Sequence, residues 1–395
     1  MTALSAEHGL VLSGGGAYGA YEVGVMKALF TGQSPASRFA PIDAGVFTGT
    51  SVGAFNAAVM TMNSGSHSAS KVAQLEQIWL GEIPDDPSSC ENGVLRFRGN
   101  PLRYFDPCVG TSPASLITEP VQDMLFLSGY WLRNIPKFFS ASGAVPQRLL
   151  ELIDLSAFIS LEPFERLIKR TLRFEEVRRS ETVLRIVATD FDTGEVRVFS
   201  NQDLTDELGS HVLMASAAMP GVFPPTFIGG TPYVDGGVVV NTPLKYAIDA
   251  GAYVLHVIYL DPDVNRIPMS RRESTIDILN RVYTIMLATT INEDVATAEW
   301  INEGLDVVER AARGELLTEE DDQRFIRIAA QIALRLQGGS PYKRLTVHRY
   351  HPHDELGGLL GMLNFDKQVI TGFVQRGFDD AVKHDCESSH CLLPQ

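Results

Sequence analysis

A serine between two glycines, placed where an apolar strand meets a helix, constrains this chain more than any other feature. Ser51 stands in the pattern Gly-Thr-Ser-Val-Gly at residues 49–53, after the apolar run 44–47 and before the helix-forming run 54–60. A tight strand-to-helix turn of this composition holds the serine hydroxyl at its tip in an unusual backbone conformation. The helix that follows directs the positive end of its dipole toward that hydroxyl. The pattern predicts that Ser51 is a nucleophile, with an ordinary glycine-rich turn as the alternative.

A second glycine cluster follows a buried strand predicted over residues 10–12. Gly14, Gly15 and Gly16 lie in this cluster, and a helix is predicted after it, running to Phe30. Consecutive glycines leave their backbone N–H groups uncovered, so these groups can converge on an anion. The cluster therefore predicts an oxyanion hole that serves the serine.

The residues of this cluster also fit the sequence motif of a nucleotide-binding loop. Gly14, Gly16 and Gly19 satisfy Gly-x-Gly-x-x-Gly, the dinucleotide fingerprint when it joins a strand to a helix. Such a site needs an acidic residue at the end of the second strand to hold the ribose. Asp43 lies at the start of that strand, and the Ser51 turn occupies its end. The oxyanion hole is thus favoured, and a nucleotide-binding oxidoreductase is kept as an alternative function.

The third motif is an aspartate followed by two glycines. Asp235 ends an apolar run and precedes Gly236 and Gly237. A carboxylate in a tight, partly desolvated turn is a stronger base than one in water, because burial disfavours its charged form. By itself Asp-Gly is more often a simple Asx turn. In the company of the other two motifs, Asp235 is predicted to be a general base.

The three motifs, in this order, resemble those of the patatin-like phospholipase family, and the stretch 215–225 is similar to the segment that precedes the family's aspartate. The resemblance implies an α/β fold with a central, mostly parallel sheet flanked by helices. It also implies a Ser51/Asp235 dyad without histidine, an oxyanion hole at Gly14, Gly15 and Gly16, and an acyl-enzyme formed from lipid esters by a phospholipase A or lysophospholipase. Neither metal nor cofactor is implied.

This chain departs from the family at one position. The family usually carries Arg or Lys in the glycine loop where Tyr18 stands in this chain. A positive charge that could hold a lipid phosphate is therefore missing here. This affects recognition of the lipid head group more than the ester chemistry. A non-catalytic lipid-binding protein with the same fold remains a further alternative.

Strands and helices alternate along the chain, as in a sheet covered by helices on both faces. A hairpin is predicted from 184–190 and 196–199, and a helix opens at Pro243 and closes at Gly251 before a strand over 253–260. We expect a catalytic domain at residues 8–265 and a mostly helical carboxyl-terminal region at 266–395, with helices over 274–336.

An insertion at about residues 81–160 interrupts the predicted domain. It is mildly basic and mixes cations with aromatic residues, Phe126 and Trp131 among them. Lipid chemistry needs an apolar route to the serine, so the segment is a candidate lid or interfacial patch. A helical subdomain with its own core is an equally good interpretation.

A serine triad that includes histidine is the competing hydrolase design, with Asp190 or Asp235 as the acid. His256 lies in an apolar run and is expected to be a partnered core residue. His348, His351 and His353 flank a proline without a recognisable metal-ligand spacing, so a solvated loop is expected. The four cysteines, Cys90, Cys108, Cys386 and Cys391, are too few for a disulfide framework, and the last two lie in a polar tail.

The net charge of the chain limits the kinds of partner that it can bind. The formal net charge of −15 argues against nucleic-acid binding and against bulk attraction to anionic membranes. Any membrane contact is therefore expected to be local and peripheral. The sequence shows neither a signal peptide nor an apolar run long enough to cross a bilayer, so a cytoplasmic location is expected.

Overall fold

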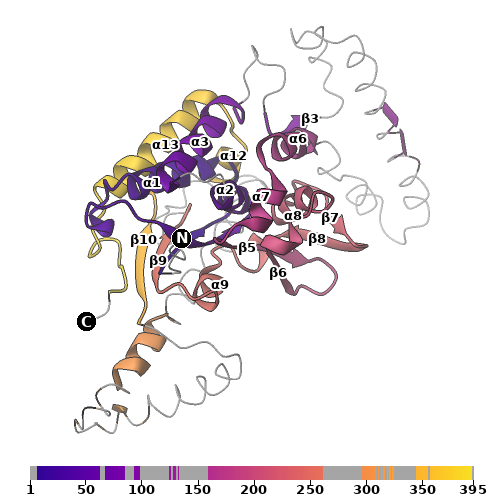
Figure 1. The fold of residues 1–395 in the computed structure, drawn as a ribbon. Helices are drawn as coiled ribbons and strands as arrows, with labels where there is room; N and C mark the ends of the chain where they lie inside the picture. The colour runs from indigo at the N-terminus through magenta and orange to yellow at the C-terminus, as the bar shows by residue number, and fades with distance from the viewer. Residues whose placement is uncertain are drawn as a thin grey trace, which may run out of the picture.

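The fold, drawn in Figure 1, is a twisted sheet covered by helices. The computed structural model describes residues 7–62, 67–84, 93–97, 159–260, 344–354 and 356–393, with scattered residues in 124–132 and 296–323. The predicted lid residues Phe126 and Trp131 and most of the predicted helical stretch 274–336 lie outside the described residues. No helix in the described part of the chain is both long and apolar enough to span a bilayer.

Short strands and helices alternate through the described part of the chain. The strands are β1 (His8–Leu12), β2 (Ala44–Thr50), β3 (Arg96–Phe97), β4 (Ile159–Ser160), β5 (Val183–Asp190), β6 (Val196–Ser200), β7 (Thr226–Ile228), β8 (Thr231–Asp235), β9 (Val254–Ile258) and β10 (Thr346–Tyr350). The helices are α1 (Gly19–Phe30), α2 (Val52–Thr61), α3 (Ser68–Gly81), α6 (Glu162–Thr171), α7 (Phe174–Arg179), α8 (Gly209–Ser216), α9 (Leu244–Asp249), α12 (Gly358–Met362) and α13 (Lys367–Val382).

The main sheet has the order β10-β9-β1-β2-β5-β8-β7, and β6 also pairs with β5. The strands from β10 to β5 are mutually parallel, whereas β6, β7 and β8 pair in antiparallel fashion. The predicted sheet, mostly parallel and flanked by helices, is thereby confirmed, as is the predicted hairpin, which is β5 and β6 around Gly194 with its φ of 73°.

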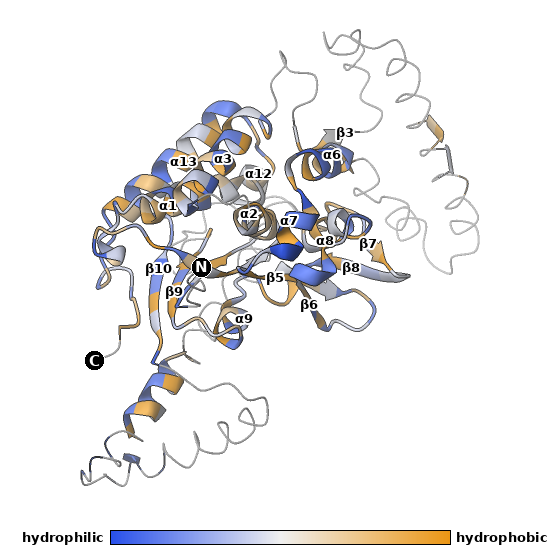
Figure 2. Ribbon diagram, in the orientation of Figure 1, coloured by the Kyte–Doolittle hydropathy of each residue, from blue (hydrophilic) through white to orange (hydrophobic). Residues whose placement is uncertain are grey.

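Side-chain alternation along the strands divides the core between the two faces of the sheet. Leu10 and Leu12 of β1 join the larger apolar cluster, with α1, α2 and α3, while Val11 joins a smaller cluster with α9. This is the period of two expected of a strand buried on both faces. In Figure 1, α9 lies on the opposite side of the sheet from α1 and α2. The outer helices α3 and α13 alternate orange and blue in Figure 2, as amphipathic helices do.

Strand β10 was not predicted from the sequence. It pairs in parallel with β9 and places His348 opposite His256. The sheet therefore extends into the region that was expected to be mostly helical.

Helices α1 and α13 touch closely through two glycines. A Cβ atom at Gly377 would lie 2.0 Å from the Tyr21 carbonyl oxygen, and one at Gly24 would lie 2.0 Å from the Val374 carbonyl oxygen. The two backbones approach each other because neither position carries a side chain.

We expect Gly377→Ala to destabilise the protein by about 1–3 kcal/mol, because the added methyl forces the two helices apart. The matched control is Gly372→Ala on the same helix, where an added methyl would meet nothing within 4 Å. That change removes a helix-interior glycine and should be neutral or stabilising by up to ~1 kcal/mol. Urea unfolding of both variants measures the difference, and equal stabilities would contradict the close contact.

Candidate active site

Ser51 stands at the junction of β2 and α2 in a strained backbone conformation. Its φ is 56° and its ψ is −123°, in a region that residues with a side chain rarely occupy. The residue is 7% exposed. Strain of this kind at a strand-to-helix turn is typical of a nucleophile whose hydroxyl is held at the tip.

The glycines around Ser51 are required by close packing. A Cβ atom at Gly49 would lie 2.3 Å from the Gly53 carbonyl oxygen, and one at Gly53 would lie 2.5 Å from the Leu12 carbonyl oxygen. The turn is therefore folded tightly on itself and pressed against the end of β1. No larger residue fits at either position without moving the backbone.

Asp235 reaches Ser51 because two strands meet end to end along one edge of β5. β6 covers one edge of β5, and on the other edge Thr50 of β2 pairs with Val187 while Asp235 of β8 pairs with Ala188. β2 and β8 run in opposite directions, so their carboxyl ends face each other. The two predicted site residues are brought together by this register.

The Asp235 carboxylate is buried and hydrogen-bonded. It accepts the Gly237 N–H at 2.7 Å, which forms the Asx turn considered from the sequence, and it also accepts a hydrogen bond from the Ser51 side chain. Burial raises the pKa of Asp235 to about 6, and the hydrogen bonds from Ser51 and Gly237 oppose that rise. The Asx turn thus presents a carboxylate of raised basicity to the serine.

The glycine loop is tied to the segment that follows Asp235. The Gly14 N–H donates to the Asn241 side-chain oxygen at 3.0 Å, and the Ser13 and Thr242 hydroxyls lie 2.8 Å apart. The Thr50 hydroxyl donates to the Val240 carbonyl oxygen at 3.0 Å. Three segments distant in sequence are therefore linked to one another by hydrogen bonds.

The stretch 215–225 braces both predicted catalytic residues. The Ser51 N–H donates to the Ser216 hydroxyl at 2.9 Å, and that hydroxyl donates to the Val187 carbonyl oxygen at 2.6 Å. The Asp235 N–H donates to the Ala218 carbonyl oxygen at 2.9 Å. Neither Ser216 nor Asn241 was assigned a role from the sequence, because such contacts cannot be read from local pattern.

The amides of the glycine loop differ in availability. The Gly14 N–H is engaged by Asn241, whereas neither the Gly15 N–H nor the Gly16 N–H donates a hydrogen bond within the described part of the chain. Gly16 has a φ of 56°, and a Cβ atom there would lie 2.3 Å from the Met362 carbonyl oxygen. Two amides of the loop are therefore available as hydrogen-bond donors within the described part of the chain.

Tyr18 does not face the place where an anion would bind. It is buried, and its hydroxyl donates to the Gly358 carbonyl oxygen at 2.6 Å. Its ring meets Phe373 edge to face. Tyr18 thus fixes α12 over the glycine loop.

An apolar pocket that is partly open to solvent begins at Ser51. A smaller pocket on its other side is lined by Gly14, Gly15, Asp235 and Asn241, and Ser51, Met219 and Met362 line both. The apolar walls include Phe55, Trp79, Ile83, Val94, Leu95, Leu161, Phe164, Phe223, Leu363 and Phe365. Ile83, Val94 and Leu95 come from the described amino-terminal part of the predicted insertion, and Leu161 comes from just beyond its end. The role of the insertion as a lid stays a prediction.

The histidine triad finds no support among the described residues, where no histidine bonds to Ser51 or Asp235. His256 is fully buried and partnered by His8 and the Tyr350 hydroxyl, so the core interpretation is confirmed. Asp190 accepts the N–H groups of its own turn at Asp192 and Thr193.

The prediction of a solvated loop at His348 is wrong. This residue lies in β10 and is only 7% exposed, because β10 pairs with β9 and the tail after α13 folds over it. His348 joins His384, Cys386 and Cys391 in a group of metal-ligand type. Sequence reasoning missed the group because β10 was not foreseen, although the spacing His-x-Cys-x₄-Cys at 384–391 carries a signal.

The position of Asp43 argues against the nucleotide site. Asp43 directly precedes β2, and His8 at the start of β1 pairs with Ala44. The glycine loop follows the other end of β1. The carboxylate therefore lies at the amino-terminal end of these two neighbouring strands and the loop at their carboxyl-terminal end, so no single dinucleotide meets both.

A model of the family described as "Patatin-like phospholipase" matches residues 10–248. The chain therefore belongs to the patatin-like phospholipase family, a class of lipid acyl hydrolases. Among solved structures, the chain is similar to VipD from Legionella pneumophila, with 13% sequence identity and a TM-score of 0.35, over 96% of this chain. This chain spans 66% of that one.

We expect Asp235→Asn to stabilise the folded protein above pH 6. Because the pKa of Asp235 is raised from 3.8 to about 6 on folding, the folded state binds this proton more tightly than the unfolded chain does. Ionisation therefore costs stability as pH rises through 6, by up to roughly 3 kcal/mol for a shift of this size. Thermal unfolding of both proteins between pH 4 and pH 8 measures the effect, and the gain should shrink toward the acidic end. A variant less stable than the parent at pH 8 would contradict the raised pKa.

Proposed function

We propose that this chain is a serine carboxylic-ester hydrolase of phospholipase A or lysophospholipase type that uses Ser51 and Asp235 as a dyad. The observation that carries the proposal is the hydrogen bond between the Ser51 side chain and the buried Asp235 carboxylate at the mouth of an apolar pocket. Family membership supports lipid acyl esters as the substrate class. The geometry of the site supports the role of each residue.

In the first half of the reaction, the Ser51 hydroxyl oxygen attacks the ester carbonyl carbon while Asp235 accepts the hydroxyl proton. The tetrahedral intermediate collapses, the bond to the leaving alcohol breaks, and Asp235 returns the proton to that alcohol. The product left on Ser51 is an acyl ester.

In the second half, the oxygen of a water molecule attacks the acyl carbon while Asp235 accepts a proton from that water. The bond to Ser51 breaks, the proton returns to the serine oxygen, and a fatty acid leaves. A base of pKa about 6 is largely ionised at neutral pH and still basic enough to accept these protons.

The oxyanion formed in both steps needs donors that are already in place. We assign this role to the Gly15 and Gly16 N–H groups, which border Ser51 and donate to no other described group. The third predicted member, Gly14, would act indirectly, because its N–H holds Asn241. Losing one such donor costs about 10² to 10³ in rate.

The apolar pocket suits an acyl chain, and membrane contact would be peripheral. The buried Tyr18 supplies no charge for a phosphate, so the site selects the acyl chain rather than an anionic head group.

The two alternative functions are less well supported. A nucleotide-binding oxidoreductase needs an acidic residue at the end of β2 to hold the ribose, whereas Asp43 lies before the start of that strand. A non-catalytic lipid-binding protein would not need a strained serine against a desolvated carboxylate.

A fluorophosphonate probe tests the dyad directly. We expect the parent chain to be labelled and Ser51→Ala to be unlabelled, because the probe bonds to the activated serine oxygen. Asp235→Asn should retain less than about 1% of the esterase rate, since the base contributes roughly 10²–10⁴-fold. Ser70→Ala, a change of the same type on α3 outside the pocket, is the matched control. Labelling of Ser51→Ala at the parent rate would refute the assignment.

The pH profile provides a separate check. Because only ionised Asp235 accepts the proton, kcat/KM should fall tenfold per pH unit below an apparent pKa near 6, the value of the buried carboxyl. Initial rates on a soluble short-chain ester between pH 4 and pH 9 measure this limb. A limb near 4, the pKa of an exposed aspartate, would contradict the role of burial.

Leu95→Asp tests the pocket. We expect it to lower kcat/KM for long-chain esters by at least about tenfold and to change short-chain hydrolysis little, because a charged wall disfavours only a chain that reaches it. Leu208→Asp, at an exposed position outside the pocket, is the control. Equal losses on short and long chains would argue against this pocket as the acyl site.

A further inference from the structure

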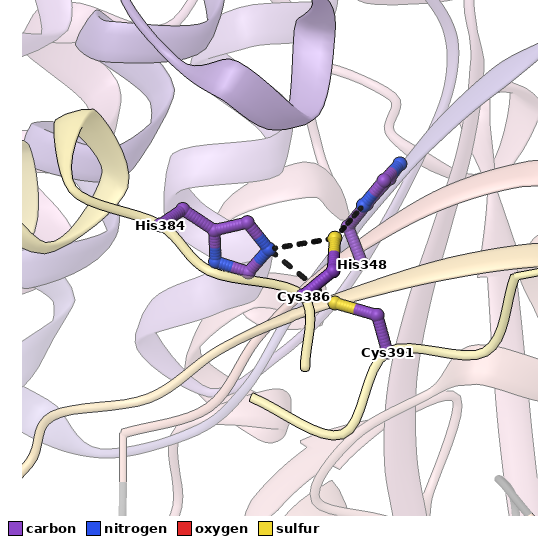
Figure 3. Close-up of side chains that lie close together, drawn as sticks. All are labelled: His348, His384, Cys386 and Cys391. Atoms are coloured by element: carbon purple, nitrogen blue, oxygen red, sulfur yellow. Dashed lines mark hydrogen bonds between the residues drawn. The ribbon is translucent and has the colours of Figure 1, made fainter. Parts of the chain in front are cut away.

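Four side chains converge at the edge of the sheet, and the proposed hydrolase mechanism uses none of them. His348 comes from β10, and His384, Cys386 and Cys391 come from the tail after α13 (Figure 3). Each offers one ligand atom, and the four atoms lie within 4.8 Å of one another. In Figure 3 the two rings and two sulfurs point toward a common centre.

Three nitrogen–sulfur distances within this cluster are close to the edges of a small tetrahedron. His348 Nδ1 is 3.3 Å from Cys386 Sγ, and His384 Nε2 is 3.5 Å from Cys386 Sγ and 3.3 Å from Cys391 Sγ. Zinc–sulfur bonds of about 2.3 Å and zinc–nitrogen bonds of about 2.0–2.1 Å at tetrahedral angles place nitrogen and sulfur about 3.6 Å apart. The side chains are therefore spaced as ligands of one ion.

We propose that His348, His384, Cys386 and Cys391 bind a single tetrahedral Zn²⁺ ion. Two thiolates and two imidazoles are a donor set that zinc prefers over calcium, magnesium or manganese, which take oxygen ligands. All four positions are filled by the protein, which is the pattern of a structural site rather than a catalytic one.

The backbone around the cluster is built to hold the sulfurs. The Cys391 N–H donates to the Cys386 carbonyl oxygen at 2.9 Å, which closes the loop between the two cysteines. The Arg349 N–H donates to Cys391 Sγ at 3.5 Å, and an amide of this kind stabilises a thiolate ligand. Val347 and Leu392 exchange two backbone hydrogen bonds of 2.8 and 2.9 Å.

The ion would clamp the carboxyl-terminal tail to β10. The tail follows α13, which packs on α1, and α12 just before it supplies Met362 to the active-site pocket. The metal site would thus stabilise elements that border the pocket without taking part in the chemistry.

Metal analysis of the full-length protein tests the proposal. The protein is reduced, reconstituted with ZnSO₄, passed through a desalting column and analysed by inductively coupled plasma mass spectrometry. We expect one zinc ion per chain in the parent and near zero in Cys386→Ser and in His384→Ala. His390→Asn should keep the full equivalent, since His390 is an exposed histidine of the same loop outside the cluster.

Cobalt substitution tests the site in the parent protein, so it remains informative if the variants fail to fold. Co²⁺ bound to the parent should give the intense visible bands of tetrahedral cobalt and a near-ultraviolet thiolate charge-transfer band, and a chelator should lower the Tm of the zinc-loaded parent. Absence of zinc from the reduced parent, octahedral cobalt spectra, or equal zinc in all variants would overturn the site. So would a Cys386–Cys391 disulfide that persists in the zinc-loaded protein. None of these readouts depends on ester hydrolysis, so this proposal and the proposed function fail separately.

Discussion

The head-to-head meeting of β2 and β8 along one edge of β5 is the constraint on which the site depends. Thr50 pairs with Val187 and Asp235 with the next residue, Ala188, so the residue after β2 and the last residue of β8 arrive at one point. A Cβ atom at Gly236 would lie 2.5 Å from the Val187 carbonyl oxygen, so the chain can leave β8 over this point only through a glycine. A register shift of one residue would turn the Asp235 side chain to the other face of the sheet.

Stability and chemistry oppose each other at this point. The positive φ of Ser51 and the burial of the Asp235 carboxylate both lower the free energy of unfolding. Both persist because the surrounding contacts fix the backbone there. Ser216 holds the Ser51 amide and Ala218 the Asp235 amide, so one stretch of chain fixes both residues. The same burial that costs stability raises the basicity of the carboxylate, as the proposed dyad without histidine requires.

The carboxyl-terminal part of the chain contributes to the site although the family match ends at residue 248. Met362, Leu363 and Phe365 line the apolar pocket, and the Met362 carbonyl lies against Gly16. Tyr18 makes the reciprocal contact by bonding to Gly358. A tyrosine in the glycine loop is thus explained by packing, since it holds the helix that closes one side of the pocket.

Local sequence was sufficient to predict the strand-turn-helix around Ser51, the glycine loop and the turn at Asp235. Glycine spacing and apolar runs fix such features within a few residues, so they can be read without the fold. Three other features became visible only in the folded chain: β8 is antiparallel and in register with Ser51, Asn241 engages the Gly14 amide, and β10 brings His348 to two distant cysteines. These depend on pairings between segments far apart in the sequence, whose energies come from the packed whole and leave no local pattern.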